Sequence, residues 1–125
     1  MPLSVATANS ILTARTASPM YLALLTVYPS WTDTGSSLHE PAAVDYSRHY
    51  LDPAYWDAPL TGVTTWNFDI TYLPVNDWGT IIAFALCSAA SAGNLEAYEY
   101  LAAPISMLPN STMRIASGMI TYGAQ

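Results

Sequence analysis

Short apolar runs, broken by prolines and glycines, most constrain what this chain can fold into. The longest runs lie at residues 21–28 and 81–87, far short of the roughly 18 residues that a membrane span needs. Residues 63–73 alternate, with Trp66, Phe68 and Ile70 on one side and polar side chains on the other. Such alternation is typical of a strand with one buried face.

The remaining runs extend this pattern. Strands are predicted at residues 20–28, 44–51, 63–73, 78–87, 95–101, 111–115 and 119–122, with turn signals about every 8 to 12 residues. Only residues 4–16 show helical spacing, with Ser4 as the N-cap and Val5, Ala8 and Leu12 following it. The long segment 29–43 is predicted to be a loop.

These elements define a fold class. About eight strands after one short N-terminal helix predict a mainly β, antiparallel protein, either a β-sandwich or a jelly roll. We expect one domain over residues 1–125, because the length is near the usual domain size and no linker divides the chain. Residues 78–87 are apolar on both faces and predict a central strand. Residues 95–101 carry Glu96 and Glu99 and predict an edge or an exposed face.

Charge is scarce in this chain. It has no lysine, its three basic side chains are Arg15, Arg48 and Arg114, and its net charge is -6. Nucleic acids and anionic membranes both require a basic surface, so neither is an expected partner. A surface with few charges and many aromatic residues favours contact with other proteins.

No catalytic, cofactor-binding or metal-binding residues are predicted, and we expect no enzyme activity. His39 and His49 lack the convergent spacing of metal ligands, so they are interpreted as loop and strand residues. Cys87 ends an apolar strand and is interpreted as a buried small hydrophobe. The acidic side chains of one loop-rich region are interpreted as a solvated face, rather than as a calcium site or a glycosidase pair: Asp33, Glu40, Asp45, Asp52 and Asp57.

The aromatic residues are the candidates for function. Trp66 and Trp78 lie in strong strand contexts and are expected in the core. The candidate contact residues are Trp31, Tyr55 and Trp56, which lie in proline-bounded loops, together with Arg48. The three loop aromatics could pack locally, contact a partner, or stack on a sugar.

The order of several motifs resembles a family of short bacteriophage virion proteins known as phage tail fibre proteins. The matching pieces run from Ala8-Asn9-x-Ile11-Leu12 and residues 21–26 (YLALLT) through Asp33-x-Gly35, Glu40-Pro41 and Tyr46-Ser47-Arg48. They continue with Asn67, Trp78-Gly79-Thr80-Ile81, Phe84-Ala85-Leu86, Gly93-Asn94-Leu95 and Ile115-x-x-Gly118. This chain departs from the family in its 88–92 turn (SAASA) and in the stretch between Pro53 and Pro59.

The resemblance implies a non-enzymatic β-sandwich of the virion. We expect a capsid decoration or cement protein that binds the outer surface of the major capsid protein lattice, or other virion proteins, as a homotrimer or homodimer. The net charge of -6 favours a site outside the shell, away from packaged DNA. The alternative is a tail fibre or baseplate appendage that contacts host surface glycans.

Overall fold

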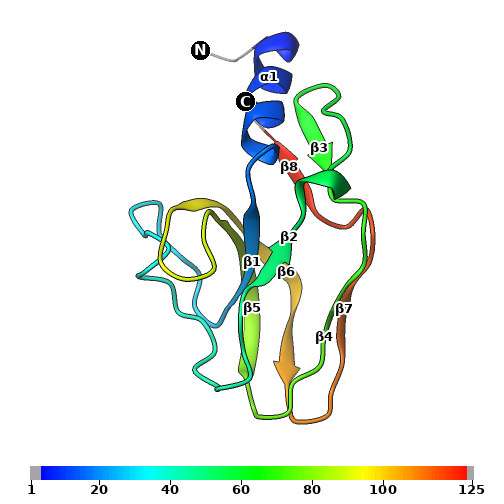
Figure 1. The fold of residues 1–125 in the computed structure, drawn as a ribbon. Coiled ribbons are helices and arrows are strands. Elements are labelled where there is room, and N and C mark those ends of the chain that lie inside the picture. The colour runs from blue at the N-terminus through cyan, green and yellow to red at the C-terminus, as the bar shows by residue number, and fades with distance from the viewer. Residues whose placement is uncertain (1–3, 124–125) are drawn as a thin grey trace.

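The computed structural model describes residues 4–123 as a mainly β protein, as predicted (Figure 1). One helix precedes eight strands, and every strand pair is antiparallel. The elements are α1 (Val5–Thr16), β1 (Met20–Leu25), β2 (His49–Leu51), the 3-10 turn η1 (Pro53–Tyr55), β3 (Val63–Thr65), β4 (Ile70–Tyr72), β5 (Gly79–Cys87), β6 (Leu95–Met107), β7 (Met113–Ile115) and β8 (Thr121–Gly123).

The helix α1 begins where the sequence predicts. The Ser4 side chain accepts a hydrogen bond from the Thr7 backbone N–H at 3.2 Å, which satisfies one of the free donors of the first turn. Ala8, Leu12 and Thr16 form the buried side of α1, which contacts β3 and β8. No helix in the part of the chain that the structure describes is long and apolar enough to cross a membrane.

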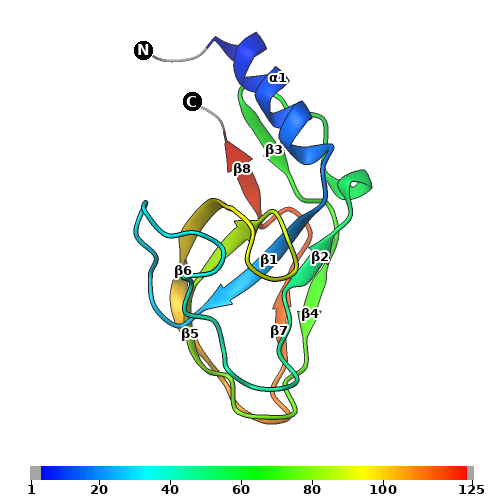
Figure 2. The same cartoon turned by 60° about the vertical axis from the view of Figure 1, so that its left-hand side comes forward.

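The largest sheet has four strands in the order β2-β1-β5-β6. The strand β5 lies between β1 and β6, which confirms the prediction of a central strand from its two apolar faces. The strand β6 is an edge strand, as its two glutamates indicated. Figure 2 shows the loop that follows β1 and the loop between β5 and β6 lying over one face of this sheet.

The strand β6 extends to Met107, beyond the predicted end at residue 101. Ile81 of β5 pairs with Ile105, whereas Ala83 pairs with Tyr100, so β6 carries extra residues at this point. Pro104 lies in this bulge, where no ladder N–H is required of it. The proline therefore bends the strand without ending it.

The predicted strand at 63–73 is interrupted. Its first part, β3, pairs with β8, and its second part, β4, pairs with β7. The register between the two chain segments changes by one residue across the break, because the five residues 116–120 between β7 and β8 lie opposite only four residues, 66–69. Phe68 lies in the gap between the two ladders, where it is half exposed and stacks on Tyr55 instead of sharing the buried face of Trp66 and Ile70. The two short sheets therefore form one interrupted ribbon.

The main core lies between this ribbon and the inner face of the four-stranded sheet. Trp66, Ile70 and Tyr72 of the ribbon side pack with Leu22 and Leu24 of β1. The opposite, outer face of the sheet buries a smaller cluster that includes Ala23, Ala83 and Ala85. Because β1 alternates between these two clusters, it is buried on both faces.

Candidate functional site

Arg48 is almost completely buried and forms the centre of a polar network. Its Nε donates to Glu40 Oε1 at 3.0 Å, and its Nη2 donates to Glu40 Oε2 at 2.9 Å and to the Gly35 carbonyl at 2.6 Å. Its Nη1 donates to the carbonyls of Ala89 and Ala92, each at 2.9 Å. All five guanidinium donors therefore have partners, from two separate loops.

The Glu40 carboxylate extends the network to the central sheet. Tyr46 donates its hydroxyl hydrogen to Glu40 Oε1 at 2.8 Å, and its oxygen accepts from the Leu24 N–H of β1 at 3.0 Å. Burial, together with the charge of Glu40, raises the pKa of Tyr46 far above its usual value. The hydrogen bond to Glu40 also raises the pKa of Arg48. Arg48 and Glu40 are therefore an ion pair, and Tyr46 stays a neutral donor.

Gly35 allows the two loops to touch. Its N–H donates to the Gly93 carbonyl at 3.0 Å. A Cβ at position 35 would lie 2.0 Å from the Ala92 carbonyl oxygen, which is too close for any side chain. The contact between the loops therefore requires glycine here.

Asp45 connects a second loop to the turn that precedes β5, through hydrogen bonds of its carboxylate. Its Oδ2 accepts from the Val75 N–H at 2.7 Å, and its Oδ1 accepts from Trp78 Nε1 and Asn76 Nδ2, each at 3.0 Å. These hydrogen bonds, with the Val75 N–H first, lower the pKa of Asp45 well below its usual value. Asp45 thereby ties its loop to the turn that precedes β5.

The structure separates the four predicted contact residues. Trp31 is 86% exposed, and Tyr55 is 41% exposed and stacks on Phe68 with ring centroids 4.5 Å apart. Trp56 is only 9% exposed and packs edge-on against Trp66 within the core. Arg48 is 8% exposed and lies inside the polar network. Contact through any of the four residues stays a prediction, and Trp31 and Tyr55 offer the most surface for it.

The His, Cys, Asp and Glu residues considered in the sequence analysis do not gather at one site among residues 4–123. Among residues 4–123, no three His, Cys, Asp or Glu side chains gather in a way that could hold a metal ion. His49 packs against Tyr72, and burial lowers its pKa. Burial also raises the pKa of the Cys87 thiol to about 11, so this thiol is protonated at neutral pH.

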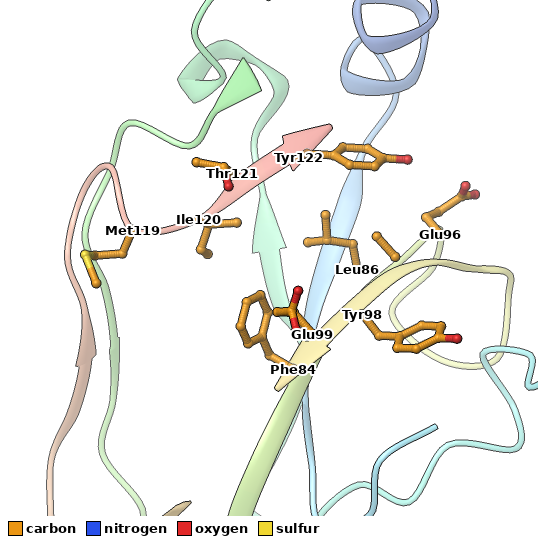
Figure 3. Close-up of a pocket in the computed structure, with 10 residues that line it drawn as sticks. Phe84, Leu86, Glu96, Tyr98, Glu99, Met119, Ile120, Thr121 and Tyr122 are labelled. Carbon is orange, nitrogen blue, oxygen red and sulfur yellow. The ribbon is translucent and has the colours of Figure 1, made fainter. Parts of the chain in front are cut away.

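An open groove lies on one side of the molecule, between β6 and the chain segment 113–122. It comprises two adjoining hollows of about 410 and 430 Å³, which share Phe84, Glu99, Met119 and Ile120 as lining residues. Figure 3 shows Glu99 and Phe84 on the sheet side and Met119 and Ile120 on the opposite wall. We call this feature the β6 groove. The sequence analysis missed it, because it depends on how far β6 and segment 113–122 lie apart.

The fold and the network define a small antiparallel β protein whose loops are held by a buried ion pair. The family described as Podophage GP4 fiber I protein gp80 matches residues 3–123 of the chain. The chain therefore belongs to this family of phage fibre proteins, and it is a component of a phage virion. A search of curated proteins found no match.

The Arg48 network should dominate the stability of the loops. Replacing Arg48 by Met leaves Glu40 and three carbonyls without their donors, so we expect a loss of about 3–5 kcal/mol in the free energy of unfolding. The matched control is Arg114→Met, because Arg114 pairs with Asp69 at an exposed site, where such a pair contributes at most about 1 kcal/mol. Urea denaturation of both variants measures the difference, and equal losses would contradict the assignment.

Because of Asp45, the free energy of unfolding should depend on pH in the acidic range. Its pKa is lower in the folded chain than the value of about 3.9 in an unfolded chain. The stability that it contributes is therefore complete above about pH 4 and disappears as the pH falls further. Asp45→Asn should be less stable than the native chain at pH 7, and the difference should shrink as the pH falls from about 4 toward the lower pKa of the folded chain. Thermal unfolding across this range tests this, and a constant difference would refute it.

Proposed function

We propose that this chain is a structural module of a phage fibre, attached to the virion by protein contacts on the open side of its sandwich. One observation carries the proposal. The β6 groove combines an unpaired strand edge with apolar walls that include Phe84 and Met119, the latter 72% exposed. Surfaces of this kind favour protein partners. The proposal assigns no catalytic step to the chain, and its partners are other virion proteins.

The family match supports a fibre in preference to the head. We nevertheless keep capsid decoration as the second candidate, because the described residues form a short body without an elongated shaft (Figure 1). A net charge of -6 is also compatible with the outer surface of a shell filled with DNA. Assembly into trimers or dimers is part of either proposal.

The location of the chain in the particle discriminates the two candidates. Virions would be separated into heads and tails with their fibres, and the chain would be quantified in each by mass spectrometry. We expect it in the tail and fibre fraction, and gold-labelled antibodies should mark the same place on intact virions. Recovery with the heads would instead support capsid decoration. A chain missing from purified particles would contradict both.

Trp31 supports a further contact of the proposed fibre module. Its indole is 86% exposed on a loop that a hydrogen bond between the Asp33 carboxylate and the Ser30 N–H, at 2.7 Å, holds in shape. A flat, exposed indole is a suitable platform for a sugar ring. If host glycans are bound here, Trp31→Ala should abolish binding on a glycan array. The control Phe68→Ala removes a half-exposed aromatic side chain elsewhere and should leave glycan binding unchanged. Binding that survives Trp31→Ala would refute this contact.

A further inference from the structure

The four-stranded sheet has two edge strands, β2 and β6, and the β6 groove lies along the second of them. In the sheet β2-β1-β5-β6, the strand β6 pairs only with β5. Its outer face is partly covered, because Tyr98 and Tyr100 pack on Tyr28, and the Tyr28 and Tyr100 rings stack at 3.7 Å. Its inner face and its edge border the β6 groove. The edge of β6 that borders the groove is therefore where an additional strand could pair.

The hydrogen-bonding pattern shows which backbone groups of β6 point toward the edge. Leu24 of β1 donates its N–H to Tyr46 and not to β5, so Leu24 and Phe84 form a pair without ladder hydrogen bonds. Phe84 then directs its backbone groups to its β6 partner, Glu99. By alternation, the backbone groups of Tyr98 and Tyr100 point outward, available to another strand.

Glu99 occupies the place of the missing strand. Its Oε1 accepts a hydrogen bond from the Tyr100 N–H at 3.0 Å, as the carbonyl of a neighbouring strand would. Its side chain lines both hollows of the β6 groove, facing Phe84 and Ile120 (Figure 3). A carboxylate is thus held where the two hollows meet, one of them largely apolar and the other lined also by polar side chains such as Glu96 and Thr121.

Among residues 4–123, Glu99 forms no ion pair, although Arg114 lines one of the same hollows. Each of the three arginines is already in an ion pair: Arg15 with Glu96, Arg48 with Glu40, and Arg114 with Asp69. The sequence contains no lysine. A second copy of the chain therefore offers Glu99 only arginines that already have carboxylate partners, whereas a different protein with a further lysine or arginine would complement it.

We propose that an extended segment of a different virion protein adds to the edge of β6 as a further strand. Its backbone pairs with Tyr98 and Tyr100, its alternate apolar side chains fill the hollows beside Phe84 and Met119, and a basic side chain pairs with Glu99. The Tyr100 N–H then bonds to the new strand instead of to Glu99. This inference rests on the proposed place of the chain in the virion, and it names the chemistry of the partner.

The position of Glu99 has a second interpretation, protection of an exposed sheet edge. Inward-pointing charges, bulges and prolines at sheet edges also prevent aggregation, and β6 carries all three. If Glu99 serves only to prevent aggregation, the edge of β6 stays unpaired in the assembled particle. The two roles therefore differ in what covers β6 in the virion.

Hydrogen exchange of the intact virion decides between them. Exchange would be followed by mass spectrometry for the chain in purified virions and for the isolated chain, with peptides that cover β6 and, as a control, the central strand β5. We expect the β6 amides to exchange at least about tenfold more slowly in virions, and β5 amides to be protected in both. Equal exchange of β6 would overturn the inference, with the proposed function intact. If no peptide of the chain is found in virions, the proposed function itself fails.

Two further outcomes test the nature of the occupant. If β6 is already protected in the isolated chain, and sedimentation shows a dimer, the occupant is a second copy and the inference is overturned. The charge is tested with Glu99→Lys against Asp57→Lys, an exposed carboxylate outside the groove; both substitutions change the net charge equally. We expect Glu99→Lys to reduce the copies per virion about tenfold, with Asp57→Lys at the native level. Equal incorporation of both variants would overturn the inference that the partner contributes a basic side chain at Glu99.

Discussion

The buried pair of Arg48 and Glu40 is the interaction on which the rest of the structure depends. A guanidinium that is almost fully removed from water is stable only if each of its donors is satisfied, and here each one is. Its partners come from the segment that follows β1 and from the loop between β5 and β6. These loops cover the outer face of the sheet, so the small cluster around Ala83 and Ala85 stays buried because Arg48 holds its cover in place.

The network also explains why the family motifs are spaced as they are. Gly35, Glu40, Tyr46 and Arg48 come from three separate motifs of the resemblance, and the structure brings them into one set of hydrogen bonds. Their side chains support the loops from inside. An exposed residue of the same loop, such as Trp31, is then free to serve a contact without loss of the scaffold. A rigid scaffold with presented loops suits a module that is built into a larger particle.

The opposite side of the molecule has a different character. The ribbon formed by β3, β4, β7 and β8 covers the inner face of β1, but β6 extends beyond it and leaves the β6 groove open. With so few charged residues, little hydration is lost when such a surface is covered. The missing lysines are also informative here, because every basic side chain is used within the chain and the carboxylate of Glu99 is left for a partner.

Much of the fold could be predicted from local patterns. The cap at Ser4, the alternating run from residue 63 and the doubly apolar run of β5 each identified an element, because each pattern reflects burial by direct neighbours. The bulge at Pro104 could not be predicted, and neither could the register change between the β3–β8 and β4–β7 pairs, since both depend on the partner strand. For the same reason the sequence predicts Arg48 only as a candidate contact residue and not as the centre of a network: its acceptors, mostly carbonyls of other loops, carry no signal in the sequence.

The central claim is that the loops are held internally while the β6 edge is left for a partner in the particle. A density map of the virion at side-chain resolution tests this most directly. The account predicts that the chain retains the Arg48 network and that an extended strand from another protein lies beside Tyr98 and Tyr100, with a basic side chain at Glu99. A map in which the β6 edge faces solvent, or in which the partner contacts only the loops around Arg48, would contradict it.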